Sequence, residues 1–307
     1  MKILITGGAG FIGSNIADRL IRDKYRVVVV DDLSTGKKEN VSSQAKFYRC
    51  DVRDKDITDI FKKEKPEIVI HNAAQISVRI SVDDPVADAD INIGGSLNIL
   101  EACKKYNVEK VIFASSGGTV YGEQKYYPAD EKHPLSPISP YGVAKLSVEK
   151  YLYYYSYNFG LRYVALRYAN IYGPGQDPYG EAGVVAIFSE KILNKENPII
   201  NGDGKQTRDY VFVGDVVEAN IRAIKGEFTG ELNIGTGKET SVVDLFSIIK
   251  RISGNESIEE IHGPPKEGEQ KRSSLSSEKA KTFLGWEPKV SIEEGLKLTY
   301  KWFKENG

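Results

Sequence analysis

The stretch KILITGGAGFIG, residues 2–13, joins a short apolar run directly to a glycine-rich turn. The turn fits G-x-G-x-x-G at positions 8, 10 and 13, and G-x-x-G-x-x-G at positions 7, 10 and 13. Glycines at this spacing allow a tight turn, close approach of the backbone to a pyrophosphate and close packing of a helix on its strand. The stretch therefore predicts a dinucleotide-binding strand–turn–helix unit, and its position after a strand disfavours a glycine-rich loop without a ligand.

The first half of the chain alternates between two kinds of segment. Short runs rich in Val and Ile recur at 26–30, 67–71, 110–114 and 162–167. This composition is typical of strands buried on both faces. Segments with helical spacing lie between them, for example at 14–24 and 91–106. The alternation predicts an α/β fold with a doubly wound parallel sheet of the Rossmann type.

The pattern changes after about residue 170. Glycine and proline cluster in the second half, and helical stretches recur at 184–195, 214–225, 242–252 and 293–304. The apolar run Tyr210–Val213 is expected to return to the sheet. We therefore expect an NAD-type dinucleotide domain at 1–170, with a returning segment near 206–235. A smaller C-terminal α/β domain at 171–205 and 236–307 would bind the substrate.

Composition excludes several classes of protein. The 307 residues include 42 basic and 43 acidic side chains, which argues against a nucleic-acid binder because such a protein needs a basic face. No apolar run approaches the ~18–20 residues that span a membrane. Two cysteines are too few for a disulfide framework or a Cys-based zinc site, and three histidines do not favour a metal centre. We expect a cytoplasmic enzyme with a cofactor other than a metal.

Two acidic positions follow predicted strands. The run at 26–30 ends in Asp31, about 20 residues beyond the turn, where a carboxylate can accept the ribose hydroxyls of NAD and would repel the 2′-phosphate of NADP. Its neighbour Asp32 also fits a solvated turn. Asp51 and Val52 follow the expected third strand. They either face the adenine or cap a helix at 54–62.

Tyr141 and Lys145 form a Tyr-x-x-x-Lys pair directly after Ser139-Pro140. Residues four apart share one face of a helix. A neighbouring cation should lower the pKa of the Tyr141 phenol and make it a general acid/base near neutral pH. The alternative is a surface pair, which the place after the fifth strand disfavours. Five tyrosines follow at 151–157 and predict a helix–helix or subunit contact.

The motifs, taken in order, resemble a known family. They include TGGAGFIGSN (6–15), SSGGTVYG (115–122), SPYGVAK (139–145), LRYANIYGPGQ (166–176) and GDGKQTRDYVFVGD (202–215). The chain resembles the nucleotide-sugar branch of the extended short-chain dehydrogenase/reductase family over essentially its whole length. Among its members it is most similar to the UDP-glucose 4-epimerases, also called UDP-galactose 4-epimerases, of archaeal and thermophile type.

The resemblance implies a reaction and its residues. Bound NAD takes a hydride from sugar C4 while Tyr141 removes the 4-OH proton, the 4-keto sugar rotates, and the hydride returns to its other face. Lys145 would tune Tyr141 and hold the nicotinamide ribose. The substrates would be UDP-glucose and UDP-galactose. The implied cofactor residues are Gly7, Gly10, Phe11, Ile12, Gly13, Asp31, Asp32, Ser34, Thr35, Gly36, Asp51, Val52, Ala73, Ala74, Gln75, Asn92, Tyr141, Lys145 and Tyr168.

The residues implied for the UDP-sugar lie mostly in the second half. Arg208 suits the diphosphate because a guanidinium offers paired donors to phosphate oxygens; the alternative for it is a surface ion pair with Asp209. The set comprises Ser116, Gly117, Tyr141, Asn170, Val184, Asn201, Arg208, Lys266, Glu269 and Arg272. In the family a homodimer commonly forms through two helices, which here correspond to about 84–106 and 140–159.

The chain departs from the family pattern at Gly117, where the epimerases usually carry Ser or Thr. Tyr141 could then contact the sugar 4-oxygen directly, which we favour. Ser116 or Thr119 could supply the hydroxyl, or an ordered water could fill the space.

The activity itself has alternatives. No acid precedes Val-Tyr-Gly, which disfavours a dehydratase or a decarboxylase. A UDP-glucuronate or UDP-N-acetylhexosamine 4-epimerase stays open, and the small Ser273 would leave room for an N-acetyl group. A catalytically silent NAD-sensing protein on this fold is the third possibility, against which Tyr141 and Lys145 count.

Overall fold

A parallel sheet of seven strands forms the centre of the molecule. The computed structural model describes residues 1–179, 183–265 and 270–306. The strand order is β11-β6-β5-β4-β1-β2-β3, and every neighbouring pair is parallel. The fold is therefore the α/β, doubly wound Rossmann type that the alternation predicted. The strands are β1 (Lys2–Thr6), β2 (Arg26–Asp31), β3 (Lys46–Arg49), β4 (Ile68–His71), β5 (Lys110–Ser116), β6 (Arg162–Tyr168) and β11 (Gly230–Ile234).

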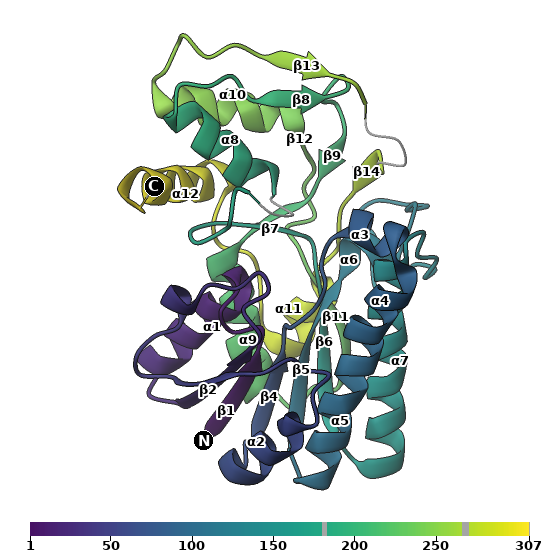
Figure 1. Cartoon of the computed structure of the whole chain (residues 1–307). Helices are drawn as coiled ribbons and strands as arrows, with labels where there is room; N and C mark the ends of the chain where they lie inside the picture. Colours follow the sequence, from purple (N-terminus) through teal and green to yellow (C-terminus); the bar gives the residue numbers. More distant parts are fainter. Residues whose placement is uncertain (180–182, 266–269, 307) are drawn as a thin grey trace.

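Helices cover both faces of this sheet because its strands are apolar on both faces. In β1, Ile3 and Ile5 join the core under α1 (Phe11–Arg22) and α9 (Val213–Lys225). Leu4, between them, joins the opposite core. That core lies under α2 (Asp56–Glu64), α5 (Gly95–Lys105) and α7 (Pro140–Phe159). Figure 1 shows α4 (Pro85–Ala89) and α5 beside α7 on this side.

A third hydrophobic core joins helices that lie beyond the carboxyl ends of the sheet strands (Figure 1). Phe188, Phe246 and Leu296 belong to it. They come from α8 (Val184–Leu193), α10 (Val242–Ser253) and α12 (Ile292–Asn306), which lie beside β8 (Ile199–Asn201) and β13 (Ile261–Gly263). The expected domain boundaries within the chain stay a prediction.

One expectation about a strand is wrong, and one of the two alternatives for Asp51 is excluded. The run at 210–213 does not join the large sheet: β10 (Tyr210–Phe212) pairs with β7 (Asn170–Tyr172), and β11 is the strand that returns. The third strand ends at Arg49 and α2 begins at Asp56. Asp51 therefore lies in the loop between them and caps no helix. Its carboxylate instead accepts hydrogen bonds from the backbone and side-chain N–H groups of Arg53, with N–O distances down to 2.5 Å.

The remaining elements bring distant segments to the site. A small sheet has the order β12-β9-β14, which sets Arg208 beside Ser273. No helix in the part of the chain that the structure describes is long and apolar enough to cross a membrane. The other elements are η1 (Lys38–Asn40), α3 (Val78–Asp83), the π-helical turn η2 (Asp90–Gly94), α6 (Gly117–Val120), β9 (Thr207–Arg208), β12 (Thr240–Ser241), β14 (Arg272–Ser273) and α11 (Glu278–Leu284).

Candidate active site

The glycine turn brings three backbone segments into direct contact. Gly7 has a φ of +66°, and a Cβ there would lie 2.6 Å from the backbone nitrogen of Ala73. A Cβ at Gly13 would lie 2.2 Å from the carbonyl oxygen of Gly7. Both positions therefore accept only glycine. Gly10 differs, because the nearest atom to its Cβ would be the Gly7 oxygen at 3.5 Å, so packing within the protein does not require glycine there.

The beginning of α1 fits a pyrophosphate. Gly10 is its N-cap, no side chain caps the helix, and its first turn, which carries Phe11 and Ile12, holds no acidic residue. The free N–H groups and the positive end of the helix dipole are thus available to an anion. The open side of Gly10 leaves room for the phosphates. These residues fit NAD in the way that the sequence predicted.

Asp31 joins the turn to the loop after β2. It is buried, and its two carboxylate oxygens accept from the backbone N–H groups of Ala9 and Leu33, both at 2.9 Å. Burial raises its pKa, while the two N–H groups oppose the rise. Each oxygen keeps a further lone pair for a ribose hydroxyl. A Cβ at Gly36 would lie 2.9 Å from Asp31 Oδ1, so the loop also needs glycine there.

The neighbouring carboxylates of Asp32 and Asp51 already accept hydrogen bonds within the protein. Asp32 accepts from the backbone N–H of Ser34 at 2.9 Å and from its hydroxyl at 2.7 Å; Ser34 and Thr35 are exposed. The Arg53 guanidinium holds the pKa of Asp51 below its usual range. Val52 is buried against Gly95, where a Cβ would lie 2.6 Å from Val52 Cγ2.

Asn92 holds the segment after β4 in place. Its side-chain oxygen accepts from the backbone N–H of Gln75 at 2.9 Å, and its amide donates to the Gln75 carbonyl at 2.9 Å. The same amide donates to Asp88 at 2.8 Å, as does the Gln75 side chain. The structure thus uses the Asn92 side chain to fix residues 73–75, so its contribution to a cofactor site is indirect. Asp88, four residues earlier on the same face, was not among the predicted residues.

His71 is a second residue that the sequence reasoning missed. Its Nδ1 lies 2.6 Å from Thr6 Oγ1 and its Nε2 lies 2.9 Å from Ser96 Oγ. Burial, together with the Lys145 charge, lowers the pKa of His71 to about 3, so the ring is neutral. Thr6 Oγ1 also accepts from the Ala73 N–H at 3.2 Å. His71 therefore ties the glycine turn to α5, the helix that directly follows η2 and its Asn92. Its position at the end of β4 was the available signal.

Two other side chains at strand ends differ in their surroundings. Asn72 has a buried amide with no hydrogen-bond partner among the described residues; Ala73 and Ala74 follow it, half-buried. Tyr168 is buried in the core under α9, and its hydroxyl accepts from Asn220 at 2.9 Å. Only the backbone of Tyr168 therefore remains for the predicted cofactor contact.

The predicted catalytic pair, Tyr141 and Lys145, stands at the beginning of α7. Ser139 caps this helix by accepting from the Gly142 N–H at 3.2 Å. Lys145 is buried, donates to the Ala114 carbonyl at 2.8 Å, and lies 5.6 Å from the centre of the Tyr141 ring. Burial lowers the pKa of Lys145 to about 8, while the carboxylates of Asp88 and Glu149 oppose the fall.

The expected depression of the Tyr141 pKa is wrong for the protein by itself. Burial, together with the Asp88 charge, raises the pKa of the Tyr141 phenol well above its usual range. Within the protein, desolvation thus disfavours the Tyr141 phenolate.

Leu275 fills the space beside Gly117. A Cβ at Gly117 would lie 2.4 Å from Leu275 Cδ1 and 3.0 Å from Cδ2, and Leu275 is fully buried. An ordered water in that space is therefore ruled out. The Ser116 hydroxyl has no hydrogen-bond partner within the described residues, whereas Thr119 Oγ1 lies 3.4 Å from the Ser116 carbonyl, to which it donates. Of the two hydroxyls, that of Ser116 is the one left to act on a ligand.

The predicted substrate residues gather around the small sheet. Arg208 donates to the Thr207 carbonyl at 2.8 Å. Asp209 is buried and accepts from the N–H groups of Thr236, Gly237 and Leu275, so the surface ion pair considered for Arg208 and Asp209 is wrong.

The other predicted substrate residues lie on neighbouring elements. Arg272 pairs with Glu239 at 2.6 Å and stacks 4.0 Å from the centre of the Tyr127 ring. Asn170, Val184 and Asn201 stand at the ends of β7, α8 and β8. Lys266 and Glu269 lie outside the described residues.

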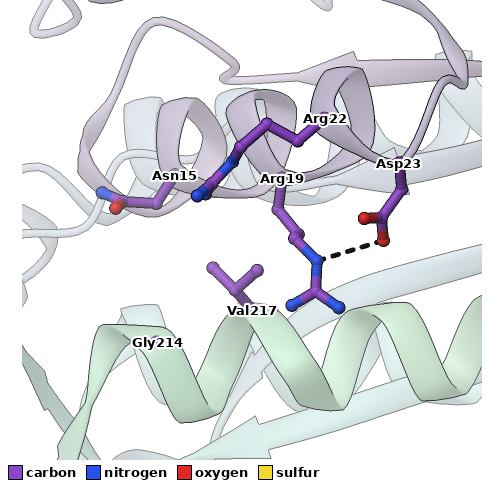
Figure 2. A pocket seen from close by; sticks show the side chains of 6 residues that line it. All are labelled: Asn15, Arg19, Arg22, Asp23, Gly214 and Val217. Atoms are coloured by element: carbon purple, nitrogen blue, oxygen red, sulfur yellow. Dashed lines mark hydrogen bonds and ion pairs between the residues drawn. The ribbon is translucent and has the colours of Figure 1, made fainter.

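A hollow of about 410 Å³ between α1 and α9 lies apart from these residues (Figure 2). Figure 2 shows Arg19 turned toward Asp23, at 3.0 Å; Arg19 also pairs with Glu218 at 3.2 Å. Its positive charge is therefore already balanced, and none of the predicted site residues lines the hollow. The lining residues are Asn15, Arg19, Arg22, Asp23, Gly214 and Val217.

A comparison with protein families identifies the chain. The sequence model of the NAD dependent epimerase/dehydratase family matches residues 3–235. The chain belongs to this family. NAD, which the glycine turn and Asp31 predicted, is thus the cofactor of the family.

Individual relatives are similar over their full length. A protein of Methanocaldococcus jannaschii described as a putative UDP-glucose 4-epimerase is 51% identical over 306 residues, 99% of both chains. The UDP-glucose 4-epimerase of Thermotoga maritima, solved with UDP-glucose, has a TM-score of 0.97 at 52% identity and 99% coverage of both chains. The Thermus thermophilus enzyme of the same name, solved with NAD, has a TM-score of 0.95 at 43% identity and 100% coverage of both.

We predict that Gly117→Ser is destabilising because the new side chain meets Leu275. Overpacking should lower the free energy of unfolding by about 1–3 kcal/mol. Adding Leu275→Ala should make room, so the double variant should lose less than the sum of the two single variants. Denaturant unfolding measures all three.

Gly118→Ser is the matched control for this prediction. A Cβ at Gly118 would meet only Ser116 Oγ, at 3.9 Å, so its stability should stay within about 0.5 kcal/mol of the parent protein. Additive losses at positions 117 and 275, or an equal loss at 118, would show that Leu275 does not occupy the space.

Proposed function

We propose that the protein is an NAD-dependent 4-epimerase of UDP-hexoses that interconverts UDP-glucose and UDP-galactose. The observation that carries the proposal is the juxtaposition of Tyr141, Lys145 and Ser116 beside the NAD-binding turn. α6 packs on the first turn of α7, where a Cβ at Gly142 would lie 3.0 Å from the Thr119 carbonyl. This packing brings the turn that begins at Ser116 to the end of the helix that carries Tyr141.

Tyr141, Ser116 and Lys145 have different roles in the proposed reaction. Tyr141 accepts the proton of the sugar 4-OH and returns it, as a general acid/base with a contact to the 4-oxygen. Ser116 donates a hydrogen bond to the same oxygen. NAD, when bound, supplies the hydride acceptor and donor for C4, and its positive ring favours the phenolate that burial alone disfavours. Lys145 adds a second positive charge and holds the nicotinamide ribose.

The other residues bind and orient the two ligands. The N–H groups at the beginning of α1 hold the pyrophosphate of NAD, and Asp31 accepts from its adenine ribose. Arg208 and Arg272 lie on adjacent strands of the small sheet and would hold the diphosphate of the UDP-sugar. Separating the diphosphate anchor from the reacting carbon allows the 4-keto sugar to turn over while the nucleotide stays bound.

A UDP-N-acetylhexosamine is the second candidate substrate. Ser273 is a small, buried residue in β14, paired with Arg208, and its small side chain would be compatible with an N-acetyl group on the sugar. A UDP-N-acetylglucosamine 4-epimerase of Methanobrevibacter ruminantium is also similar, with a TM-score of 0.94 at 37% identity over 100% of this chain. A UDP-glucuronate 4-epimerase of Thermodesulfobacterium geofontis is 34% identical over 99% of this chain.

Turnover of a panel of UDP-sugars without added NAD tests the proposal. We expect UDP-galactose and UDP-glucose to interconvert, since the reaction consumes no net NAD. Faster turnover of UDP-N-acetylglucosamine or UDP-glucuronate would replace the proposed substrate. Failure of every sugar to react, with NAD bound, would favour a silent NAD-sensing protein.

The protein is expected to retain NAD through purification. The glycine turn and Asp31 supply contacts to both the pyrophosphate and the ribose. Denaturation should release about one NAD per chain and no NADP, measured by enzymatic cycling of the released nucleotide. Release of NADP, or an empty protein without affinity for NAD, would contradict this assignment.

Tyr141→Phe should lower turnover by roughly 10²–10⁴-fold, the usual contribution of a positioned acid/base. NAD content should not change, because the ring remains. Tyr155→Phe, which removes a phenol from the same helix where it bonds to Glu101, serves as control and should keep the parental rate. Ser116→Ala should cost about 10–100-fold, as expected for a hydrogen bond of about 1.5–3 kcal/mol to a developing charge.

We also propose that the protein is a cytoplasmic homodimer formed through α4, α5 and α7. Cys50 and Cys103 are buried free thiols, as expected in a reducing compartment. Tyr153 and Tyr157 are 60% and 79% exposed on α7, an apolar surface of the kind that subunits cover.

Light scattering at micromolar concentration should therefore give the mass of two chains. Tyr157→Arg should shift the measured mass toward that of one chain, because it places a charge in the proposed subunit contact. Phe283→Arg, at a residue 54% exposed on α11, should leave the dimer intact. A parent protein with the mass of one chain would overturn the proposal.

A further inference from the structure

Two successive turns of α7 are fastened to the end of β5. Tyr141, Lys145 and Glu149 are spaced four residues apart, so they share one face of the helix. Lys145 Nζ donates to the Ala114 carbonyl at 2.8 Å, and the next residue of β5, Ser115, donates its hydroxyl to Glu149 Oε1 at 2.6 Å. The chain after Ser115 continues directly into Ser116 and α6. The two hydrogen bonds therefore fix the position of α7 relative to the turn that carries the Ser116 hydroxyl.

Glu149 is itself held by a paired guanidinium. Arg167 of β6 donates from Nε to Glu149 Oε1 at 2.9 Å and from Nη2 to Oε2 at 2.6 Å. Glu149 is 1% exposed and Arg167 is 3% exposed. A buried carboxylate and a buried guanidinium cost free energy unless each is fully paired. Their geometry satisfies that condition, and removing either partner would leave a charge in the interior.

The network continues toward the substrate side of the molecule. Arg167 Nη1 donates to the Tyr121 hydroxyl at 2.9 Å, which donates to Asn233 Oδ1 at 2.7 Å. Asn233 in turn donates to the Ala129 carbonyl at 3.0 Å. Ala129 pairs with the backbone around Leu275, the residue that packs on Gly117. One set of buried polar contacts thus joins the catalytic helix to the segment beneath the sugar site.

We propose that Glu149 and Arg167 are positioning residues for the reaction proposed above. The pair holds α7 on β5 so that the Tyr141 phenol and the Ser116 hydroxyl face one oxygen atom, and the Glu149 charge keeps the Lys145 ammonium charged in its buried site. The inference rests on the proposed function for its kinetic consequences. Neither residue touches substrate or cofactor, and both act through Lys145 and Tyr141.

The charges around Lys145 determine the sign of the expected effects. Asp88 from α4 and Glu149 from α7 favour the ammonium, whereas Lys145 itself disfavours protonation of the neutral His71 from β4. Arg167 lies behind Glu149 and balances its charge. If Glu149 becomes neutral, Arg167 is left as an excess positive charge and the pKa of Lys145 must fall. If Arg167 becomes neutral, Glu149 is left as an excess negative charge and that pKa must rise.

The experiment compares Glu149→Gln, Arg167→Met and the double variant. Lys145 acts as an ammonium, so activity falls as pH rises through its pKa. Glu149→Gln should move this alkaline limb of the kcat profile down by about one pH unit and lower kcat about 10–100-fold by loosening α7. Arg167→Met should move the limb up by a similar amount. The double variant should return it close to the position in the parent protein.

A control and a second readout separate this role from ordinary stability. Glu64 is also a buried carboxylate, paired with Lys2 at 3.0 Å and Lys46 at 2.5 Å at the far edge of the sheet. Glu64→Gln should lower the melting temperature but leave the pH profile unmoved. NMR titration of lysine labelled with ¹⁵N, with Lys145→Met to identify the signal, follows the same pKa without any substrate.

The outcomes are distinguishable. Opposite shifts of the Lys145 signal in Glu149→Gln and Arg167→Met support the inference even if no UDP-sugar reacts, in which case only the proposed function fails. The inference would be overturned if the Lys145 signal does not shift in either variant and the loss of activity only matches the fraction of unfolded protein. If a single variant does not fold, the double variant with Glu149→Leu and Arg167→Met removes both charges. Parental kcat in that folded variant would also overturn the positioning role.

Discussion

The direct contact of backbone with backbone at the glycine turn is the constraint on which the rest of the structure depends. Because Gly7 and Gly13 lack a Cβ, the end of β1, the beginning of α1 and the segment after β4 meet at distances that a side chain would prevent. This contact leaves the beginning of α1 uncapped and open to an anion. It also lets Thr6 reach His71 and the Ala73 N–H, so the turn sets the position of the loop that lines the cofactor side.

Desolvation controls the chemistry that this framework can support. Burial alone would neutralise both Tyr141 and Lys145, since it disfavours the phenolate as well as the ammonium. A second set of buried charges works against this effect for Lys145. Asp88 and Glu149 favour the ammonium. In the proposed function, this ammonium and the positive ring of bound NAD would favour the Tyr141 phenolate.

The sequence predicted what depends on local pattern and missed what depends on long-range contact. Strands, the glycine turn, Asp31 and the Tyr141–Lys145 pair are local, because periodicity and spacing within one segment define them. The pairing of β10 with β7, and the rise in the Tyr141 pKa, arise from residues more than thirty positions away. The same holds for Asn92: the family resemblance implies a cofactor-lining position for it, but could not tell that its amide would donate to Gln75 and Asp88.

Glycine stands at position 117, where the epimerases usually carry Ser or Thr, because the Leu275 side chain packs against this position. Leu275 occupies the place of a side chain at 117, and its backbone is held by the Asp209 carboxylate and by a bridge to Ala129. A hydroxyl at 117 and a leucine at 275 exclude each other by volume. Of the two remaining hydroxyls of this turn, that of Thr119 donates to the Ser116 carbonyl, which favours Ser116 as the hydrogen-bond donor to a ligand. In the proposed function, Tyr141 is then the titratable partner of the sugar 4-OH proton, and the alignment of its helix would determine how well the transfer works.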